Sequence, residues 1–588
     1  MEEYTHNFSL DVQGVRGSCP AGEAYAKQQL AVIIPKYIKA KYWLKSYPRD
    51  LSPEVFIPSV SLAQFLEEGM RNNLNQVAMV YAGREIRYSE MQDGINRFAS
   101  VLHRWGVKKG ETVALFLSNC PQFAFAYYGA LKIGAMVTAL SPLFMSPEVE
   151  FQLRDSHART LVVQQEFWPR VEPVLPKLDL QEVIFVNLRG EKPALPKFPK
   201  VYFFDDLLTA NLPSPPPVGI DPEEDVAVLQ YTGGTTGRPK AAMLTHQNVV
   251  ANIAQNRGYW EMMAKVDGVM RPTVISVLPW YHIYGQTVDL SSTLYGGGTL
   301  IVLSGFEVDL VLRTIQETQA HIFMGVSTMF VSFLNHPRLK EYDLRSLKWC
   351  NNGATIIPSE VVKNFEEITG VKIVEGYGLS EASPVTHTTS PYLKRKIGSV
   401  GPPIPNTLQG IIDPDTGEFR PPGEPGEVIV HGPQVMKGYW QRPQETADVF
   451  LRVDGQKWLR TGDMGILDED GYLTIVDRYK DLIKYKGHSV YPSEVEEVLY
   501  QHPAVSQAAV IGVPDPLAGE NIKAFVVLKD EFRGKIKEEE IVSWTRERLA
   551  VYKFPRSVEF RQEIPKSAVG KILRRVLRDE ELKKEKQG

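Results

Sequence analysis

Cysteine, net charge and long apolar runs are all scarce in this sequence. Its 588 residues include three cysteines at wide spacing, which excludes a disulfide framework and a cysteine-based metal site and favours a reducing cytoplasm. Lys and Arg number 66 against 70 Asp and Glu, so the formal net charge is −4 and a nucleic-acid partner, which normally meets a strongly basic domain, is not indicated. Hydrophobic residues at 43% and charged residues at 23% exclude a collagen or a wholly disordered chain.

Signals for membrane insertion and secretion are also lacking. The most apolar stretch, residues 123–140, is interrupted by Lys132 and two glycines, whereas a membrane-spanning helix needs about 20 apolar residues. The first residues, Met1–Tyr4, are acidic and are not followed by a basic and then an apolar segment, so we expect no secretory signal. The sequence therefore predicts a protein with no transmembrane segment.

The order of apolar and amphipathic stretches predicts an α/β protein with two parts. Amphipathic stretches alternate with short apolar runs over roughly residues 60–190 and 240–390, which favours helices layered on parallel sheets. A turn-rich, β-leaning region follows at 398–476. We predict a large N-terminal body of layered α/β subdomains plus a β-rich subdomain over residues 1–479. A small mobile α+β C-terminal domain would occupy residues 480–588.

A loop rich in glycine and threonine gives the strongest chemical signal. The apolar run 226–229 predicts a buried strand, and it leads into Tyr-Thr-Gly-Gly-Thr-Thr-Gly-Arg-Pro-Lys at residues 231–240. Glycine permits close approach and positive φ, so the backbone N–H groups of such a loop can surround phosphate oxygens. Lys240 adds a positive charge for the same anion, and no Gly-Lys-Ser/Thr follows as in the Walker pattern. The predicted phosphate ligands are Thr232, Gly233, Gly234, Thr235, Thr236, Gly237 and Lys240.

Further motifs follow in a fixed order, and together with this loop they carry a resemblance. They are Leu-Pro-Trp-Tyr-His at 278–282, Gly-Tyr-Gly-Leu-Ser-Glu at 376–381, Thr-Gly-Asp at 461–463, Asp-Arg-Tyr-Lys-Asp at 477–481, and Pro565-Lys566-Ser567 with Gly570-Lys571. The set resembles the signatures of the adenylate-forming superfamily, which includes acyl-CoA synthetases, adenylation domains of peptide synthetases and firefly luciferases. The resemblance covers roughly residues 40–580. It is strongest to prokaryotic medium- or long-chain fatty acyl-CoA synthetases, since Trp43–Pro48 is similar to the opening of long-chain members.

The resemblance implies a two-step reaction that uses ATP, Mg²⁺ and coenzyme A. A carboxylate attacks the α-phosphorus of ATP and pyrophosphate leaves; the thiol of CoA then attacks the acyl carbon and AMP leaves. Because a carboxylic acid is already ionised at neutral pH, the first step needs no general base. It needs cations and N–H donors that offset the repulsion between two anions.

Four catalytic residues follow from the resemblance. Lys571, expected to open a helix, would bridge the carboxylate and the α-phosphate; a cation in a first turn opposes the helix dipole by about 0.3–1 kcal/mol, so helix stability does not account for it. Glu381 would be the Mg²⁺ ligand, a hard oxygen donor for an ion held mostly by waters and phosphates. His282 would face the substrate carboxylate. Lys480 would be the hinge about which the small domain turns after adenylation, removing Lys571 from the site.

The resemblance assigns the remaining site residues to three ligands. Tyr377 offers a ring face to adenine, Asp463 has two oxygens for the ribose hydroxyls, and Arg478 supports the nucleotide from the hinge region. Gly353, Ala354, Gly378 and Ser380 complete the nucleotide site, Ser380 standing where the family usually has threonine. The predicted acyl pocket comprises Trp280, Tyr281, Gly325, Thr328 and Gly376, and Gly487 would let the pantetheine arm of CoA pass.

Each assignment has a purely structural alternative. Without its motif, Tyr377 is a packed aromatic, Glu381 a surface glutamate, Asp463 a turn-stabilising aspartate, His282 a core histidine and Lys480 a flexible-linker lysine.

Alternative functions also stay open. An aryl-CoA ligase or an enzyme that loads a carrier protein would share the motifs, and a non-enzymatic fatty-acid-binding or uptake protein could share the fold. The joint presence of Lys571, Glu381, Asp463 and Lys240 argues against the non-enzymatic alternative. The expected partners are small molecules, namely a fatty acid, ATP and CoA. The resemblance is also compatible with a homodimer and with peripheral contact at the inner face of the membrane, and it leaves the acyl-chain length undetermined.

Overall fold

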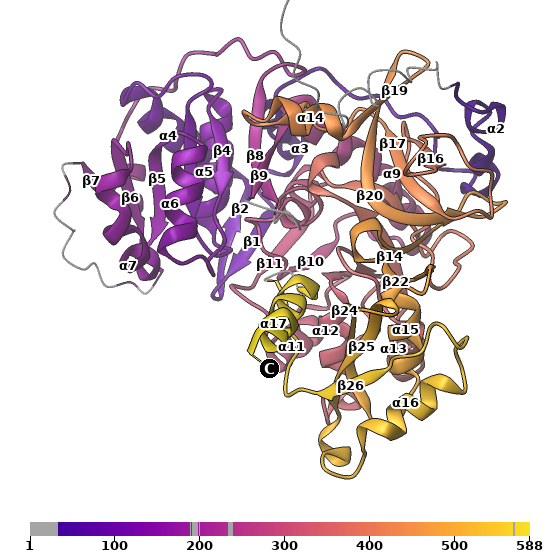
Figure 1. Cartoon of the computed structure of the whole chain (residues 1–588). Helices are drawn as coiled ribbons and strands as arrows, with labels where there is room; N and C mark the ends of the chain where they lie inside the picture. Colours follow the sequence, from indigo (N-terminus) through magenta and orange to yellow (C-terminus); the bar gives the residue numbers. More distant parts are fainter. Residues whose placement is uncertain are drawn as a thin grey trace, which may run out of the picture.

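The computed structural model describes residues 33–188, 190, 198, 200–232, 239–567 and 571–587. Figure 1 shows a large body and, below it, a smaller orange-to-yellow part that contains the C-terminus. Within the described residues, two eight-stranded sheets and a five-stranded sheet build the body, and another five-stranded sheet builds the smaller part. The predicted α/β class with a small C-terminal α+β unit is therefore confirmed.

The first eight-stranded sheet carries the strand that leads into the glycine-rich loop. In spatial order its strands are β18 (Gly438–Tyr439), β9 (Lys240–Thr245), β8 (Val226–Thr232), β4 (Met136–Ala139), β3 (Thr112–Phe116), β5 (Ala158–Gln164), β6 (Glu182–Val186) and β7 (Val201–Phe203). From β8 to β7 neighbouring strands are parallel, whereas β8 and β9 are antiparallel and place Thr232 opposite Lys240. Its helices are α4 (Tyr88–Arg104), α5 (Pro121–Lys132), α6 (Ser146–Asp155), α7 (Trp168–Val171) and α8 (Phe204–Leu208).

Apolar residues run continuously along the central strands of this sheet because both of its faces are covered. Val113 and Leu115 of β3 belong to one core, whereas Ala114 and Phe116 belong to another on the opposite face. This is the period-2 alternation of a strand between two layers of helices. It explains why short apolar runs, rather than alternating ones, predicted the parallel strands.

The strands of the second eight-stranded sheet end at the candidate site. In spatial order its strands are β15 (Val385–Thr388), β14 (Ile373–Gly378), β13 (Trp349–Asn352), β12 (Ile322–Gly325), β10 (Thr273–Ser276), β11 (Thr299–Val302), β1 (Val77–Tyr81) and β2 (Arg84–Arg87). The strands from β14 to β1 are parallel, and β15 and β2 are antiparallel edges. Because the carboxyl ends of parallel strands meet at one edge, the loops after β12, β13 and β14 come together there. Its helices are α9 (His246–Asp267), α10 (Ser292–Tyr295), α11 (Val308–Thr318), α12 (Ser327–Leu334) and α13 (Ser359–Thr369), with a π-helical turn at Tyr284–Ser291.

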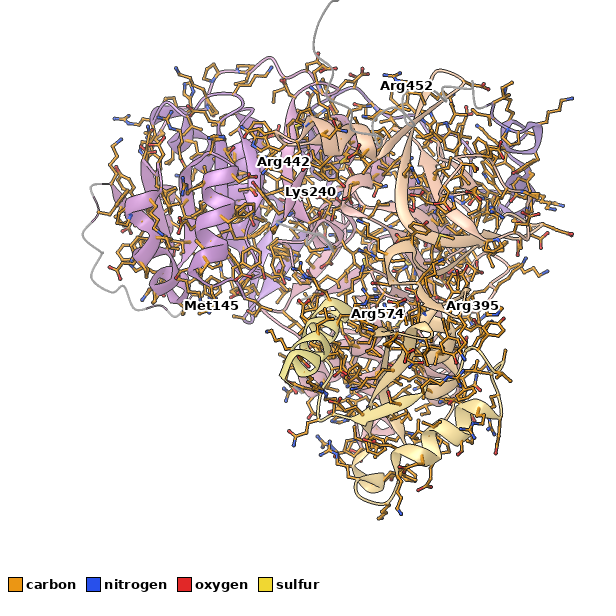
Figure 2. All side chains as sticks on the ribbon, viewed as in Figure 1. Met145, Lys240, Arg395, Arg442, Arg452 and Arg574 are labelled. Carbon is orange, nitrogen blue, oxygen red and sulfur yellow. The ribbon has the colours of Figure 1, made fainter. Side chains whose placement is uncertain are left out.

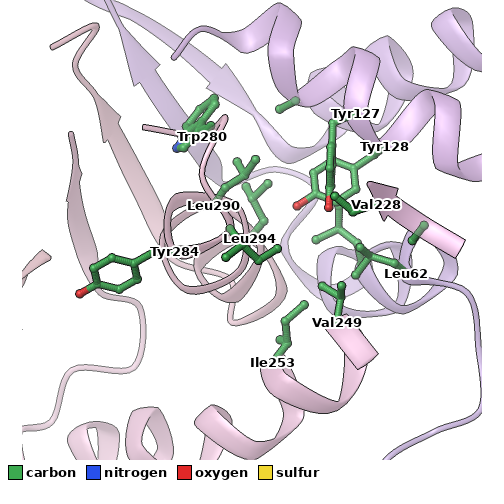
Figure 3. Close-up of a cluster of buried hydrophobic side chains, with 14 of the residues drawn as sticks. Leu62, Tyr127, Tyr128, Val228, Val249, Ile253, Trp280, Tyr284, Leu290 and Leu294 are labelled. Carbon is green, nitrogen blue, oxygen red and sulfur yellow. The ribbon is translucent and has the colours of Figure 1, made fainter. Parts of the chain in front are cut away.

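The main hydrophobic core lies between the two large sheets. Figure 3 shows its centre, where side chains of α5, α9 and the π-helical turn meet. Helix α3 (Leu62–Met70) closes this core, and its Leu62 is fully buried. Helix α9 starts in a capping box, in which Thr245 accepts from the Asn248 N–H and the Asn248 side chain accepts from the Thr245 N–H. This core contains residues of both large sheets and so joins them into one body.

The five-stranded sheet of the body is antiparallel. Its strands are β16 (Leu408–Ile412), β17 (Gly426–His431), β20 (Gln456–Leu467), β19 (Phe450–Val453) and β21 (Leu473–Arg478). The first described segments pack on it, with Trp43 buried against Ile412 and Trp458. The helices of this part of the body are α2 (Lys36–Lys39) and α14 (Pro443–Asp448). This is the predicted β-rich subdomain.

The C-terminal part has its own sheet and core. Its elements are β22 (Ile483–Tyr485), β23 (His488–Val490), α15 (Pro492–Tyr500), β24 (Val505–Asp515), β25 (Gly519–Leu528), α16 (Glu538–Arg546), β26 (Ser557–Phe560) and α17 (Arg574–Gln587). Val495 and Leu499 of α15 pack with Val510 and Val526 of the sheet in a cluster of C-terminal residues. Within the residues that the structure describes, no helix anywhere in the chain is long and apolar enough to cross a membrane.

Candidate active site

The candidate site begins where β12, β13 and the π-helical turn meet. The Gly353 N–H donates to the Gly325 carbonyl at 3.2 Å, and the Tyr284 hydroxyl donates to Asn351 Oδ1 at 2.6 Å. A Cβ on Gly353 would lie 2.8 Å from the Tyr284 ring, so only glycine allows this contact. Ala354, the next residue, is exposed and has φ +65°, a left-handed conformation that costs about 1–2 kcal/mol outside glycine.

Strand β14 brings the Gly-Tyr-Gly motif to the same edge. The hydroxyl of Tyr377 donates to Asp463 Oδ2 at 2.6 Å, and burial, together with that carboxylate, raises the pKa of Tyr377. A Cβ on Gly378 would lie 2.1 Å from the Pro384 carbonyl oxygen, which requires glycine there. Gly376 precedes Tyr377 on the same strand. Tyr377 and Asp463, 86 residues apart, thus belong to one site.

Asp463 is held from two sides. It is 8% exposed and faces Arg478 across the β20–β21 pair, with Arg478 Nε 3.3 Å from Oδ1. Each carboxylate oxygen keeps a further lone pair beyond its contact with Tyr377 or Arg478. The arrangement therefore leaves acceptors for two more hydroxyl donors, as ribose recognition demands.

Lys571, from the C-terminal part, lies within electrostatic range of Asp463 and Arg478. The pKa of Lys571 is lowered to about 8, mainly by burial and also by the charges of Arg478 and Arg574, whereas Asp463 and Asp481 oppose the shift. The expectation that Lys571 opens a helix is wrong, because α17 begins at Arg574.

The Lys571 segment is instead held by a hydrogen bond to Ser567 and by an isolated antiparallel bridge. The Lys571 N–H donates to Ser567 Oγ at 3.1 Å, and Lys566 forms an antiparallel bridge with Ile572. Burying an ammonium group costs free energy, so packing alone does not explain this lysine either.

His282 is neutral and lies within electrostatic range of Lys571. Burial lowers the pKa of His282 to about 4, and the charge of Lys571 contributes to the shift. Its Nδ1 accepts the Tyr284 N–H at 3.2 Å, so in the neutral imidazole Nε2 carries the proton. His282 can therefore donate a hydrogen bond from Nε2 to a substrate carboxylate.

A second corner of the site joins the phosphate loop to Glu381. Ser380 and Glu381 lie in the 3-10 turn that follows β14, and Glu381 Oε1 accepts the Tyr439 hydroxyl at 2.7 Å. The ammonium of Lys240 lies 5.2 Å from the centre of the Tyr439 ring, and Figure 2 shows Lys240 in the middle of the body. Thr232 Oγ1 donates to the Lys240 carbonyl at 3.4 Å. Tyr439 was not selected from the sequence, because nothing local connects it with a glutamate 58 positions earlier.

The predicted phosphate loop continues through residues 233–238. Its predicted ligands Gly233, Gly234, Thr235, Thr236 and Gly237 lie outside the described residues.

A single carboxylate at this corner matches the donor set that Mg²⁺ prefers. Among the described residues no cluster of three or more His, Cys, Asp or Glu side chains could hold a metal ion by itself. Mg²⁺ keeps several waters and binds through one or two carboxylates plus phosphate oxygens. Glu381, oriented by Tyr439, fits such a site.

The predicted acyl-pocket residues divide into core and partly exposed positions. Trp280 is fully buried: its indole donates to Ser276 Oγ at 3.1 Å and its ring packs edge-on against Phe123. Tyr281 is half-buried, and burial raises its pKa. Gly325 ends β12, and Thr328 is partly buried on the first turn of α12. The structure brings Gly325 and Gly376 to one sheet edge and places Trp280 in the core beside it.

The predicted hinge and CoA residues lie on the surface. Lys480 is exposed in a 3-10 turn at Tyr479–Asp481, directly after β21. Gly487 is exposed in the turn between β22 and β23, with φ +82°. Exposure suits both roles, which stay predictions.

Comparisons with known proteins show which family this chain resembles. A family model described as AMP-binding enzyme matches residues 66–440, and one described as AMP-binding enzyme C-terminal domain matches residues 494–571. A long-chain-fatty-acid–CoA ligase of Bacillus subtilis is 41% identical over 563 residues, covering 92% of this chain and 98% of the relative. A feruloyl-CoA synthase of an Amycolatopsis species is 36% identical and covers 86% and 96%. The crystal structure of ATP-bound MatB from Rhodopseudomonas palustris, 28% identical, superposes with a TM-score of 0.79 over 89% of this chain and 99% of that one.

Proposed function

This chain belongs to the AMP-binding enzyme family, and from that premise we propose that its acid substrate is a long-chain fatty acid. The protein is an ATP-dependent, AMP-forming acid–thiol ligase of the fatty acyl-CoA synthetase type, which uses ATP, Mg²⁺ and coenzyme A. The preference for a long chain is supported by the Bacillus subtilis relative, which matches over nearly its whole length. The observation that carries the proposed site is the convergence of Lys571, His282, Asp463 and Tyr377, which come from four separate parts of the sequence.

In the proposed first step the chain positions two anions that repel each other. Asp463 and Tyr377 fix the nucleoside, and Lys571 places a positive charge between the fatty acid carboxylate and the α-phosphate. At an effective dielectric constant near 20, one such charge about 4 Å from an anion contributes about 4 kcal/mol. The Nε2–H of His282 orients the attacking carboxylate, which bonds to the α-phosphorus while pyrophosphate leaves. Mg²⁺, when bound at Glu381, supplies positive charge to the phosphates.

The second step is proposed to need another orientation of the C-terminal domain, residues 480–588, relative to residues 1–479. In the orientation seen here Lys571 lies within electrostatic range of Asp463, which supports a role in the first step, and we propose that it withdraws before the CoA thiol enters. Lys480, exposed between the two parts, is the proposed hinge, and Gly487 would then border the path of the pantetheine arm. The separate core of the C-terminal part supports movement as a unit.

Substrate scope tests the proposal directly. Purified enzyme is assayed for ATP–pyrophosphate exchange and acyl-CoA formation with saturated acids of four to eighteen carbons, benzoate, cinnamate and ferulate. We expect the highest kcat/KM for the long-chain acids of this series. Preference for ferulate would assign the aryl-CoA ligase function that the Amycolatopsis relative favours. Absence of exchange with every acid would leave only a binding protein.

Location and assembly belong to the same proposal. We place the enzyme in the cytoplasm at the inner face of the membrane, where long-chain acids partition, and as a homodimer. The cysteines described in the structure, Cys120 and Cys350, are buried free thiols, which supports a reducing compartment. Vesicle flotation and light scattering test the membrane contact and the dimer.

Glu381→Gln tests the metal assignment. The amide removes the negative charge yet preserves shape and the acceptor for Tyr439, so we expect an unchanged melting temperature. Adenylate formation should fall about tenfold, a barrier increase of about 1.4 kcal/mol, and should need more Mg²⁺ for half-maximal rate. A Mg²⁺ titration that coincides with that of the wild type would remove Glu381 from the site.

The pKa of Lys571 near 8 predicts an alkaline limit for the first step. The ammonium is protonated below this pH and loses its charge as the pH rises through it, so kcat/KM for ATP should be level below pH 8 and fall above it. Lys571→Arg should retain charge and show no fall up to pH 9.5, at a lower overall rate. A decrease of the same shape in both enzymes would assign the titration to another group.

A further inference from the structure

Two adjacent glutamates on helix α15 contact opposite sides of the junction between the C-terminal part and the body. Glu496 faces the segment that follows Lys571, and Glu497 faces the body. Neighbouring residues on an α-helix point about 100° apart, so a single turn can hold both sides.

Glu496 anchors the segment that carries Lys571. Arg574 Nη2 donates to Glu496 Oε1 at 2.9 Å and to Oε2 at 2.8 Å, and the Val510 N–H donates to Oε1 at 2.8 Å. Arg574, labelled in Figure 2, is the first residue of α17 and lies three positions after Lys571. Charge-assisted bonds of this kind restrict geometry as well as contributing energy. The position of Lys571 is therefore tied to that of α15.

Arg574 also faces the two ends of the proposed hinge. Its Nη1 lies 3.9 Å from Asp477 Oδ1 and 3.9 Å from Asp481 Oδ2. Asp477, the last but one residue of β21, additionally accepts the Ser493 N–H of α15 at 3.0 Å. The start of α17, α15 and the hinge thus form one connected group.

Glu497 fastens this group to the body. Helix α13 begins at Ser359, and its N-cap residue, Pro358, makes no side-chain cap. The Ser359 N–H instead lies 3.2 and 3.3 Å from the two carboxylate oxygens of Glu497. A side-chain acceptor at this position stabilises a helix, and a negative charge there adds to the effect through the helix dipole. A second contact, from Asn335 Nδ2 to Ser506 Oγ at 3.3 Å, lies at the end of the neighbouring helix α12.

We propose that Glu497 is a positioning residue for adenylation: by capping α13 it holds the orientation in which α15, Glu496 and Arg574 present Lys571 to Asp463 and His282. This inference rests on the proposed function. The Glu497 contact joins two parts that turn relative to each other about Lys480, so it stabilises the first orientation and not the second. Its loss should therefore slow adenylate formation without slowing the transfer to CoA.

Three variants test the contact from both sides. Glu497→Ala removes the acceptor, and ATP–pyrophosphate exchange should fall about five- to tenfold. Ser359→Pro removes the donor at the first helical position, where proline is well tolerated, and should produce a similar fall. Glu497→Gln keeps an oxygen that can accept the Ser359 N–H and should lose at most about threefold. These factors correspond to about 1–1.4, 1–1.4 and 0.7 kcal/mol.

Glu494→Ala is the matched control. Glu494 lies on the same helix but forms an ion pair with Lys553 inside the C-terminal part, so both half-reactions should match the wild type. Thioester formation from supplied acyl-AMP should be unchanged in every variant. Wild-type exchange in both Glu497→Ala and Ser359→Pro, or equal loss in both half-reactions at an unchanged melting temperature, would overturn the inference. A wild-type enzyme that exchanges pyrophosphate with no acid would overturn the proposed function instead.

Discussion

Lys571→Ala should reduce adenylate formation by at least about 10³-fold, a barrier increase of about 4 kcal/mol. The reason is positional: Lys571 is a C-terminal cation within electrostatic range of Asp463, Arg478 and His282. Thioester formation from supplied acyl-AMP should stay within about threefold of the wild type, because the proposed second orientation withdraws this lysine. The two half-reactions are measured separately, by pyrophosphate exchange and by acyl-CoA release.

The neighbouring lysine provides the control for this variant. Lys566 donates to Gln507 Oε1 at 2.6 Å within the C-terminal part, and its pKa is lowered by burial. Lys566→Ala therefore removes another partly buried cation, at the same antiparallel bridge, and should keep both half-reactions. Equal loss in both steps for Lys571→Ala would show that Lys571 is structural or is shared by the two steps.

Lys480→Pro should lower acyl-CoA formation at least about tenfold, a barrier increase of about 1.4 kcal/mol, while appreciable pyrophosphate exchange remains. Proline fixes φ near −65°, which lies in the range of the 3-10 turn that Lys480 occupies here, and it removes the backbone N–H. The substitution should thus retain the orientation that presents Lys571 and oppose the one needed for CoA.

Lys480→Ala separates the backbone from the side chain. The Lys480 side chain is exposed, so alanine removes little packing and keeps the backbone free to rotate. We expect a much smaller loss than with proline in either half-reaction. Normal acyl-CoA formation by Lys480→Pro would refute the hinge assignment and, with it, the two-orientation mechanism.

Local patterns in the sequence were sufficient for the fold class and the family. The apolar runs of β3 and β4 reflect burial on both faces, which a strand between two helical layers imposes on every residue. The motif Gly376–Glu381 depends on backbone requirements, such as a Cβ-free Gly378, that leave a mark at one position. Such constraints act within a few neighbouring residues, so they can be recognised in the sequence without knowledge of the tertiary structure.

Pairings between distant segments were decided only by the tertiary structure. The bridge between Lys566 and Ile572 turned the expected helical start at Lys571 into an extended segment. The proton on His282 Nε2 follows from a Tyr284 N–H that the imidazole accepts.

No local sequence pattern specified the long-range hydrogen-bond partners of the site residues. Tyr439 reaches Glu381 over 58 positions, and Glu497 reaches Ser359 over 138. A hydrogen bond of this kind needs one donor and one acceptor, which many residues could supply, so its choice depends on which surfaces the packed core brings together. The sequence by itself thus determined which residues the chemistry requires, and the tertiary structure decided how they are oriented, because orientation depends on packing between segments far apart in the chain.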